Sequence, residues 1–244
     1  MSYIVELFSG IQGEGPIVGY RQIFVRFAQC QLDCKYCDTN FQQQPYASIE
    51  LQPGSRSFEK WENPVSSDRL IAHIKTMLQH LSHHSVSLTG GEPLLHCQYL
   101  RELSTGLRDE NVLIYLETNG LLYEQLSSVI DVIDIIGMDM KLESSTGEVT
   151  RWEEHEKFLE IAKQKDVFVK LIVSADTTEE EILKAAEIIC RQDQSIPLIL
   201  QPVTPTNGLY PPTPDRLLVL METAMKHLSH VRVIPQTHVM LQQL

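Results

Sequence analysis

The sequence predicts an α/β fold in which six βα units form a partial, open TIM-like barrel, (βα)6. Two observations lead to this prediction. Short runs rich in Ile, Val and Leu recur along the chain, and such runs are typical of parallel strands that are covered on both faces. The segments between them repeat their apolar residues at helical spacing. Strands and helices that alternate in this way imply βα units joined by right-handed crossovers.

Seven short apolar runs are expected to form the strands. They are Ile23–Phe27, Val86–Leu88, Val112–Leu116, Ile135–Met138, Val167–Val173, Leu198–Leu200 and Val231–Ile234. A helix after each of the first six strands makes six βα units, followed by a last strand. The chain is then two helices short of a complete eight-fold barrel, so an open barrel is the best interpretation.

Helices are expected where capping residues precede apolar residues at helical spacing. Ser66 and Ser67 precede the first such segment. Thr178-x-x-Glu181 is a capping box, and Thr213-Pro214 places a cap before a proline at the first helical position. The apolar faces expected for these three helices are Leu70, Ile71, Ile74, Leu78 and Leu81; Ile182, Ala186 and Ile189; and Leu217, Leu218, Met221 and Leu228.

Residues 42–65 interrupt this alternation. The segment contains Gln42-Gln43-Gln44 and Pro53-Gly54-Ser55 and shows no periodicity. We expect it to be a surface insertion, with a substrate lid as the alternative. Neither an internal repeat nor a linker divides the chain, so residues 1–244 are expected to form a single domain.

Acidic residues outnumber basic ones, with 32 Asp and Glu against 20 Lys and Arg and a formal net charge of −12. This disfavours binding to nucleic acid or anionic membranes, which requires clustered Lys and Arg. The chain has no apolar run of ~18 residues, and its first residues lack the features of a signal peptide. We therefore expect a cytoplasmic protein. In that reducing compartment, the five cysteines are better candidates for ligands or core residues than for disulfides.

Polar residues follow the ends of six expected strands. These segments are the cysteine-containing segment after Phe27, then Thr89–Glu92, Glu117–Gly120, Asp139–Lys141, Gln201–Pro202 and Gln236–His238. In parallel α/β folds the carboxyl ends of the strands share one face, where ligands bind. The convergence of these segments predicts an enzyme with its site on that face.

Cys30-x-x-x-Cys34-x-x-Cys37 places three thiols within eight residues, directly after an expected strand. A structural zinc site normally takes four ligands, and neither Cys97 nor Cys190 belongs to a second C-x-x-C pair. An iron–sulfur cube held by three thiolates keeps one iron open to an external ligand. The spacing is that of radical S-adenosylmethionine (SAM) enzymes. The alternative is a zinc knuckle that recruits a histidine.

Thr89-Gly90-Gly91-Glu92-Pro93 follows a second expected strand. The two glycines let a ligand approach the backbone, whose N–H and C=O groups can bind a charged amino-acid moiety. Taken alone, the segment is most simply a structural turn between a strand and a helix. Together with the cysteine motif, it resembles the turn of radical SAM enzymes that binds the methionine amine.

The order of the motifs resembles the order found in one family in particular. From the amino terminus they are Gln12-Gly13-Glu14-Gly15, Phe24-Val25-Arg26, the cysteine motif with Asp38-Thr39, Gly90-Gly91-Glu92-Pro93, Glu117-Thr118-Asn119-Gly120, Gln201-Pro202 and Gln236-Thr237-His238. Over nearly its whole length the chain resembles the 7-carboxy-7-deazaguanine synthase family. It departs from that family at Gln29, where Gly is usual, and at Asp139-Met140-Lys141, which replaces Ser-Pro-Lys.

This resemblance implies a homodimeric carbon–nitrogen lyase with a modified partial barrel. The substrate would be 6-carboxy-5,6,7,8-tetrahydropterin, contracted to 7-carboxy-7-deazaguanine with loss of ammonia in 7-deazapurine and queuosine biosynthesis. A donor such as flavodoxin or ferredoxin would reduce a [4Fe–4S] cluster. SAM would be cleaved to a 5′-deoxyadenosyl radical that abstracts hydrogen from the substrate's C6, and SAM would later be regenerated.

The resemblance also implies roles for individual residues, none of which is a protein radical or nucleophile. The cluster ligands would be Cys30, Cys34 and Cys37, and the Mg²⁺ ligand would be Thr39. The substrate would bind at Ile11, Gln12, Gly13, Glu14, Arg26, Thr89, Glu117, His238 and Leu244. SAM would bind at Tyr36, Asp38, Gly90, Gly91, Glu92, Asp139, Met140, Lys141, Gln201, Pro202, Val203 and Thr204.

Physical chemistry agrees with two of these roles. A guanidinium such as that of Arg26 suits a carboxylate, because it donates two charge-assisted hydrogen bonds. A single hydroxyl such as that of Thr39 holds Mg²⁺ only when substrate oxygens and waters complete the octahedron.

Two other functions are compatible with parts of this pattern. A radical SAM activase that installs a glycyl radical on a partner protein would share the cysteine motif and the Gly-Gly-Glu turn. It would not require Gln12-Gly13-Glu14-Gly15 together with Arg26, which suit a small anionic substrate. A non-catalytic zinc-binding module is the third possibility and would use the cysteines alone.

Overall fold

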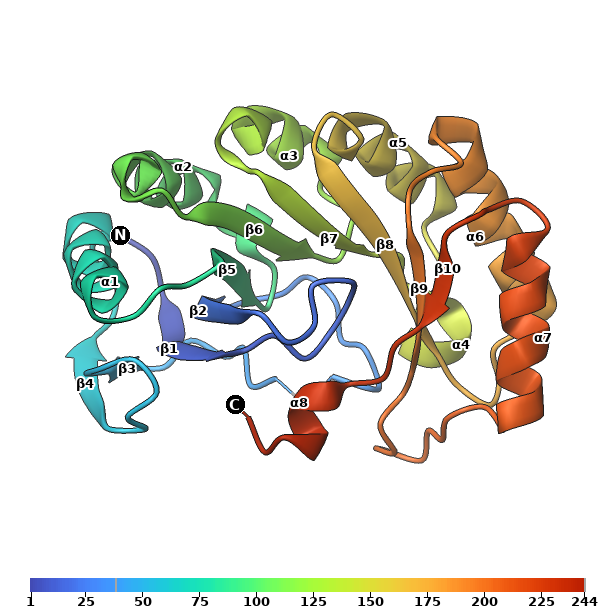
Figure 1. Ribbon diagram of the computed structural model, residues 1–244, viewed down its shortest axis with the longest axis horizontal. Coiled ribbons are helices and arrows are strands. Elements are labelled where there is room, and N and C mark those ends of the chain that lie inside the picture. The colour runs from blue at the N-terminus through green and yellow to red at the C-terminus, as the bar shows by residue number, and fades with distance from the viewer. Residues whose placement is uncertain (38, 244) are drawn as a thin grey trace.

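One curved sheet organises the molecule (Figure 1). The computed structural model describes residues 1–37 and 39–243. Ten strands lie in the order β10-β9-β8-β7-β6-β5-β2-β1-β3-β4, so the sheet is open between β10 and β4. The strands are β1 (Ile4–Ile11), β2 (Arg21–Phe27), β3 (Tyr46–Glu50), β4 (Phe58–Glu62), β5 (Ser85–Gly90), β6 (Leu113–Thr118), β7 (Ile135–Asp139), β8 (Asp166–Val173), β9 (Leu198–Pro202) and β10 (Val231–Val233).

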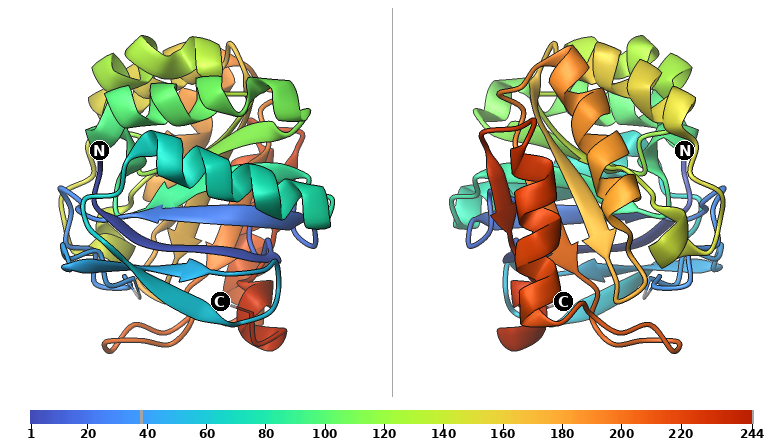
Figure 2. Two further views of the ribbon diagram at one scale, coloured as in Figure 1. Left: turned by 90° about the vertical axis from the view of Figure 1, so that its left-hand side faces the viewer. Right: turned by 90° about the vertical axis from the view of Figure 1, so that its right-hand side faces the viewer.

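Neighbouring strands from β2 through β5 to β10 pair in parallel, whereas β1 is antiparallel to β2. The six longer helices α1, α2, α3, α5, α6 and α7 form an arc around the outer face of the sheet (Figures 1 and 2). The helices are α1 (Ser67–His80), α2 (Cys97–Gly106), α3 (Tyr123–Val129), α4 (Glu143–Thr146), α5 (Trp152–Ala162), α6 (Glu179–Gln192), α7 (Pro214–Met225) and α8 (Thr237–Met240), with short 3₁₀ turns at Pro93–His96, Arg108–Glu110 and Ile130–Val132.

Side chains along the parallel strands alternate between the hydrophobic core under the helices and the cavity on the inner face of the sheet. In β8, Val167, Val169 and Leu171 pack in the main hydrophobic core beneath the helices. Phe168 and Lys170 point the other way and line the cavity on the inner face. The same alternation recurs in β2, β5, β6 and β7, because successive side chains of a strand point to opposite faces. The helices thus cover an apolar outer face, and polar residues are free to line the inner one.

The expected strands and the six βα units are confirmed, and so is the capping box of α6. Thr178 Oγ1 accepts from Glu181 N at 3.2 Å, and the Glu181 carboxylate accepts from Thr178 N at 3.0 Å. Two residues of the expected helix faces are exposed instead of buried, Leu81 at 38% and Leu218 at 67%. Leu81 lies beyond the last residue of α1 and is therefore off its buried face.

The expectation of a surface insertion without secondary structure over residues 42–65 is wrong. The segment contains β3 and β4, an antiparallel pair that joins the sheet through β1. Ala47, Ile49 and Trp61 from this pair are buried in the main core. The pattern was not visible in the sequence because each strand has only five residues, and β4 exposes four of its five. β1 is likewise a strand that the expected list omitted.

Candidate active site

The inner face of the sheet opens into a cavity of about 870 Å³, a size typical of small-molecule sites. Its wall is built from inward-facing residues of neighbouring strands. These are Arg26 on β2, Thr89 on β5, Glu117 on β6, Asp139 on β7, Lys170 on β8 and Gln201 on β9. Because the parallel strands are in register, polar side chains far apart in the sequence share one surface.

Gln12, which is buried, and Glu117, which is partly exposed, form a hydrogen-bonded cluster on one side of the cavity. Gln12 Nε2 donates to Glu117 Oε1 at 2.7 Å and to Gln22 Oε1 at 2.9 Å. Thr89 Oγ1 donates to the other oxygen, Glu117 Oε2, at 2.8 Å. The Glu117 carboxylate is therefore held by Gln12, Thr89 and, at 3.5 Å, Ser87 while it still faces the cavity. Such a fixed acceptor suits recognition of N–H groups on a planar heterocycle.

Glu14 anchors the amino-terminal turn to the far side of the sheet. Its carboxylate accepts from Lys170 Nζ and from Gln236 Nε2, the latter at 2.8 Å. Burial alone would raise the pKa of Glu14. The charge of Lys170 and the hydrogen bonds from Lys170, Gln236 and Gln201 outweigh it and lower the pKa to about 2. Glu14 is therefore an anion at neutral pH, and its bond to Lys170 ties the turn after β1 to β8.

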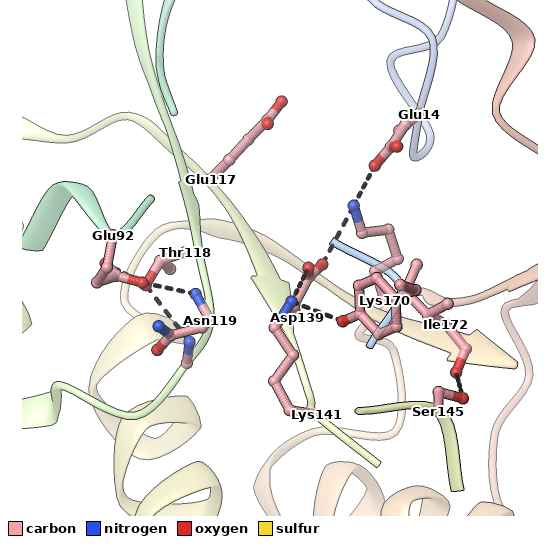
Figure 3. A network of polar contacts seen from close by, with 12 residues as sticks. Glu14, Glu92, Glu117, Thr118, Asn119, Asp139, Lys141, Ser145, Lys170 and Ile172 are labelled. Carbon is pink, nitrogen blue, oxygen red and sulfur yellow. Dashed lines mark hydrogen bonds and ion pairs between the residues drawn. The ribbon is translucent and has the colours of Figure 1, made fainter. Parts of the chain in front are cut away.

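A second carboxylate, that of Asp139, continues this network (Figure 3). Asp139 Oδ1 lies 3.2 Å from Lys170 Nζ, and Oδ2 accepts from Lys141 Nζ at 2.7 Å. Lys141 Nζ also donates to the Tyr36 hydroxyl oxygen at 2.8 Å. Burial opposes the charge of Lys141, but Asp139 and Tyr36 raise its pKa well above the ordinary value. Two carboxylates and two ammonium groups thus alternate along the wall.

Arg26 is oriented by a residue that the sequence analysis did not single out. Arg26 Nε donates to Glu6 Oε1 at 2.7 Å, and both side chains line the cavity. Arg26 Nη1 lies 3.5 Å from Thr39 Oγ1. Because Glu6 binds one edge of the guanidinium, donors on its other edges face the cavity, where an anionic group of a ligand can be bound.

The three thiols of the cysteine loop, residues Cys30–Cys37, line the same cavity. Lys35 N donates to Thr146 O at 3.0 Å, and Asn207 Nδ2 donates to Lys35 O at 2.8 Å, so α4 and the 204–208 segment hold the loop. Burial raises the pKa of Cys34 to about 11, although Lys141 opposes this shift.

The donor set of this loop fits an iron–sulfur cluster. Three thiols within one short loop supply soft ligands, and Lys141 provides a positive charge beside them. Asn119 Nδ2 is placed as a donor to Cys30 Sγ at 3.9 Å. Over residues 1–37 and 39–243, no three His, Cys, Asp or Glu side chains are gathered tightly enough to hold a metal ion. Cluster ligation by these thiols therefore stays a prediction.

The Gly-Gly-Glu turn packs directly against the cysteine loop. Glu92 N donates to Gln29 O at 2.7 Å. A Cβ on Gly91 would lie 1.8 Å from Gln29 O, so only glycine permits this approach. Glu92 itself is fully buried and accepts from Thr118 Oγ1 at 2.9 Å and Asn119 N at 2.8 Å (Figure 3). Burial raises its pKa to about 7, against these hydrogen bonds, which lower it.

The carboxyl-terminal segment closes one side of the site. Thr237 N donates to Gly13 O at 2.9 Å. A Cβ on Gly13 would lie 2.3 Å from His238 Nδ1, so the absence of a side chain there lets the two segments touch. His238 lines the cavity.

Most residues implicated by the sequence line this one cavity. They are Ile11, Gln12, Gly13, Glu14, Arg26, Cys30, Cys34, Tyr36, Cys37, Thr39, Thr89, Gly90, Gly91, Glu117, Asp139, Lys141, Gln201, Val203, Thr204 and His238. Asp38 and Leu244, expected to bind SAM and substrate respectively, lie outside the described residues.

Glu92, Met140 and Pro202 are not among the residues that line the cavity. Met140 packs in the main core, and Pro202 is at the strand position between Gln201 and Val203, which do line it. Neighbouring residues of an extended segment point to opposite sides, so a whole tripeptide cannot contact one ligand through its side chains. For these three residues, only a backbone contact with SAM remains as a prediction.

Glu6 and Lys170 are the charged cavity residues that the sequence analysis missed. The other charged residues of the site lie in turns or near the carboxyl ends of strands, whereas these two lie within β1 and β8. The alternation Phe168-x-Lys170-x-Ile172 is the signal that identifies Lys170, because all three residues share the inner face.

The fold and this site define an α/β barrel enzyme of the radical SAM class. Residues 24–189 match the Radical SAM superfamily. The fold is similar to the crystal structure of QueE from Escherichia coli, with a TM-score of 0.61 and 21% identity over 96% of this chain and 94% of that one. A radical SAM methyltransferase from Sphaerobacter thermophilus aligns with a TM-score of 0.60 and 10% identity, over 88% of this chain and 66% of that one.

Proteins of similar sequence identify the family within this class. The chain is 44% identical over 243 residues to the 7-carboxy-7-deazaguanine synthase of Geobacter sulfurreducens, covering 98% of this chain and 96% of that protein. It is 33% identical to the enzyme of the same name from Methanocaldococcus jannaschii, covering 96% and 97%. The chain belongs to the 7-carboxy-7-deazaguanine synthase family of the radical SAM superfamily. Membership implies a [4Fe–4S] cluster and SAM.

These relatives do not favour the activase or the zinc module as the function of this chain. Among the described helices, none combines the length and the apolar character that crossing a bilayer demands.

Proposed function

We propose that this enzyme is a lyase that converts 6-carboxy-5,6,7,8-tetrahydropterin to 7-carboxy-7-deazaguanine, with loss of ammonia. The observation that carries the proposal is one cavity that joins the three thiols of the cysteine loop to a polar wall suited to a small anionic heterocycle. The product class places the enzyme in 7-deazapurine and queuosine biosynthesis.

Cys30, Cys34 and Cys37 hold the cluster in this proposal. The [4Fe–4S] cluster supplies, when bound together with SAM, the one-electron reductive cleavage that starts radical chemistry at C6 of the substrate. Flavodoxin or ferredoxin is the proposed type of electron donor. The protein's own contribution is to bind, orient and shield the reactants.

SAM binds along the side of the cavity nearest the cysteine loop. Gly90 and Gly91 line this side of the cavity, and because neither has a Cβ, their turn packs against the backbone of Phe27 and Gln29 and presents its own backbone to the methionine moiety. The remaining SAM contacts come from Tyr36, Asp139, Lys141, Gln201, Val203 and Thr204, all of which line this cavity. The ammonium of Lys141, which donates to Tyr36 and Asp139, supplies the positive charge on this side of the cavity for the carboxylate of SAM.

The pterin binds along the opposite side. Arg26, whose guanidinium is oriented by Glu6, binds the substrate carboxylate. Glu117, held by Gln12 and Thr89, accepts from N–H groups of the ring. The amino-terminal turn, with Ile11, Gly13 and Glu14, and His238 close over the substrate.

Mg²⁺ is proposed to bind at Thr39, whose hydroxyl lies 3.5 Å from Arg26 Nη1. The Thr39 hydroxyl would supply one oxygen ligand, and the ion would add positive charge beside Arg26 for an anionic substrate. Replacing Thr39 by Ala should abolish the stimulation of activity by Mg²⁺ without removing the cluster.

A cytoplasmic homodimer is the proposed form of the enzyme, by resemblance to its family.

Product analysis tests the function. Reduced and reconstituted enzyme is incubated with SAM, Mg²⁺ and carboxytetrahydropterin, and the products are identified by mass. The proposal expects 7-carboxy-7-deazaguanine. SAM cleavage without any deazapurine would contradict it and favour the activase. A colourless protein that binds zinc in place of about four irons per chain would instead favour the zinc module.

A further inference from the structure

Lys170 is a charged residue on the inner face of β8 whose side chain is only 11% exposed. Phe168 and Ile172 lie at the neighbouring inward positions of the same strand and line the same cavity. An ammonium group at such a position is costly unless carboxylates compensate its charge. The partners of Lys170 therefore define its role.

Two carboxylates from different parts of the chain bind Lys170 (Figure 3). Nζ donates to Glu14 Oε2 and lies 3.2 Å from Asp139 Oδ1. Asp139 and Lys170 are register partners on β7 and β8, so strand pairing itself creates their contact. Burial opposes the charge of Lys170, but Asp139 and Glu14 outweigh it and raise the pKa above its ordinary value. Lys170 and Glu14 are therefore charged at neutral pH.

The two partners of Lys170 connect it to different parts of the proposed site. Glu14 is in the amino-terminal turn, two residues after Gln12, which donates to Glu117 at 2.7 Å on the pterin side. Asp139 accepts from Lys141 at 2.7 Å, and Lys141 bonds to Tyr36 within the cysteine loop, on the SAM side. Lys170 thus connects the two sides through one Nζ atom.

We propose that Lys170 is a positioning residue that couples the two subsites, so that occupancy of the SAM side raises the affinity of the pterin side and the reverse. This inference rests on the proposed function. Two carboxylates and two ammonium groups balance one another along Glu14, Lys170, Asp139 and Lys141. A ligand that fixes Asp139 and Lys141 also fixes Lys170, and with it the turn that carries Glu14. Such a coupling is reciprocal.

Equilibrium binding measures this coupling without turnover. Labelled SAM is dialysed against reconstituted protein with an oxidised cluster, with and without saturating carboxytetrahydropterin. The coupling factor is the ratio of the two dissociation constants for SAM, and the wild type is expected to show about fivefold or more. Lys170→Met is expected to reduce the factor to near one. A wild-type factor near one, or an unchanged factor in Lys170→Met, would overturn the proposal.

Further variants separate coupling from folding, because Lys170→Met leaves Glu14 without a counter-charge and Asp139 with Lys141 alone. Asp139→Asn keeps the bond between Lys170 and Glu14, and is expected to lose the coupling while its circular dichroism matches the wild type. Lys170→Arg keeps the charge and should retain the coupling. Lys163→Met, at the exposed end of α5, is the matched control and should leave the factor unchanged. A folded Asp139→Asn protein whose coupling factor equals that of the wild type would also overturn the inference.

The same experiments distinguish a failure of the proposed function from a failure of this inference. If carboxytetrahydropterin does not bind the wild type in the same dialysis and yields no deazapurine on reduction, the substrate assignment is wrong. If the wild type makes the product and shows no coupling, the role of Lys170 alone is wrong.

Discussion

The cysteine loop and the strand-built wall of the cavity are constructed in opposite ways. The loop places three thiols within eight residues of one continuous segment, and its own backbone groups help to hold it, as in Lys35 N to Thr146 O and Asp33 N to the Glu148 carboxylate. The wall assembles side chains from six neighbouring strands and ties them together by side-chain bonds, as in Thr89–Glu117 and Asp139–Lys170. Chemistry concentrated on a loop can be recognised from spacing, whereas a wall becomes visible only once the strand register is known.

This difference predicts that damage to the loop removes the cofactor, while damage to the wall alters binding. Cys34→Ala is the most severe change and should prevent assembly of a [4Fe–4S] cluster and abolish product formation. Iron per chain and electron paramagnetic resonance after reconstitution measure this. Cys190→Ala, on α6 and outside the cavity, is the matched control and should keep about four irons. A Cys34→Ala protein with a full cluster would refute the assignment of the loop.

Glu92 contacts both regions, since its N–H bonds to Gln29 beside the loop and its carboxylate bonds to Thr118 on β6. Its burial should make the free energy of unfolding depend on pH. Its pKa rises from 4.5 to about 7 on folding, mainly because of burial. At a pH below 4.5, Glu92 is protonated in both the folded and the unfolded protein. Between the two values the folded state binds more protons, so stability falls as the pH rises, by up to about 3 kcal/mol, and is constant above the upper value.

Glu92→Gln removes this titration. Urea-unfolding midpoints at pH 5 and pH 8 test it: the wild type should lose stability between the two, and the variant should lose much less. Equal pH dependence in the two proteins would show that Glu92 is not the titrating group.

Arg26 belongs to the wall, so its removal should spare the cluster. Arg26→Ala should raise the KM for carboxytetrahydropterin roughly tenfold to hundredfold, the loss of a charge-assisted hydrogen-bonding group. Steady-state kinetics and iron content are measured together. Arg21→Ala, on the exposed start of the same strand, is the control and should change neither. If Arg26→Ala lost iron and substrate binding to the same extent, Arg26 would not act in substrate binding alone, and the separate roles of loop and wall would be contradicted.

The smallest expected effect concerns the backbone just before the cysteines. Gln29 has a φ of +71°, in the left-handed region that favours glycine. Gln29→Gly should therefore raise stability by about 0.5–1 kcal/mol, seen as a higher Tm. Gln42→Gly, at an exposed position after the loop, should give no gain. A fall in Tm for Gln29→Gly would show that the side chain contributes more than the strain costs.

The sequence was sufficient to predict the parallel strands, because their apolar runs are short and separate. It was also sufficient for the cysteine loop and the Gly-Gly-Glu turn, which are contiguous. The strands β3 and β4 could not be predicted, since β4 presents a single buried residue, Trp61. Lys170 and Glu6 could not be placed from strand ends, because they lie inside strands and acquire partners only through the fold.

The stoichiometry of product and SAM is the most direct test of the account. Because SAM is regenerated in the proposed reaction, a limiting amount of SAM with excess carboxytetrahydropterin and a reductant should yield several molecules of 7-carboxy-7-deazaguanine for each SAM supplied. Mass spectrometry quantifies the product and 5′-deoxyadenosine in the same sample. Irreversible accumulation of 5′-deoxyadenosine equal to the SAM supplied, with no deazapurine, would contradict the account.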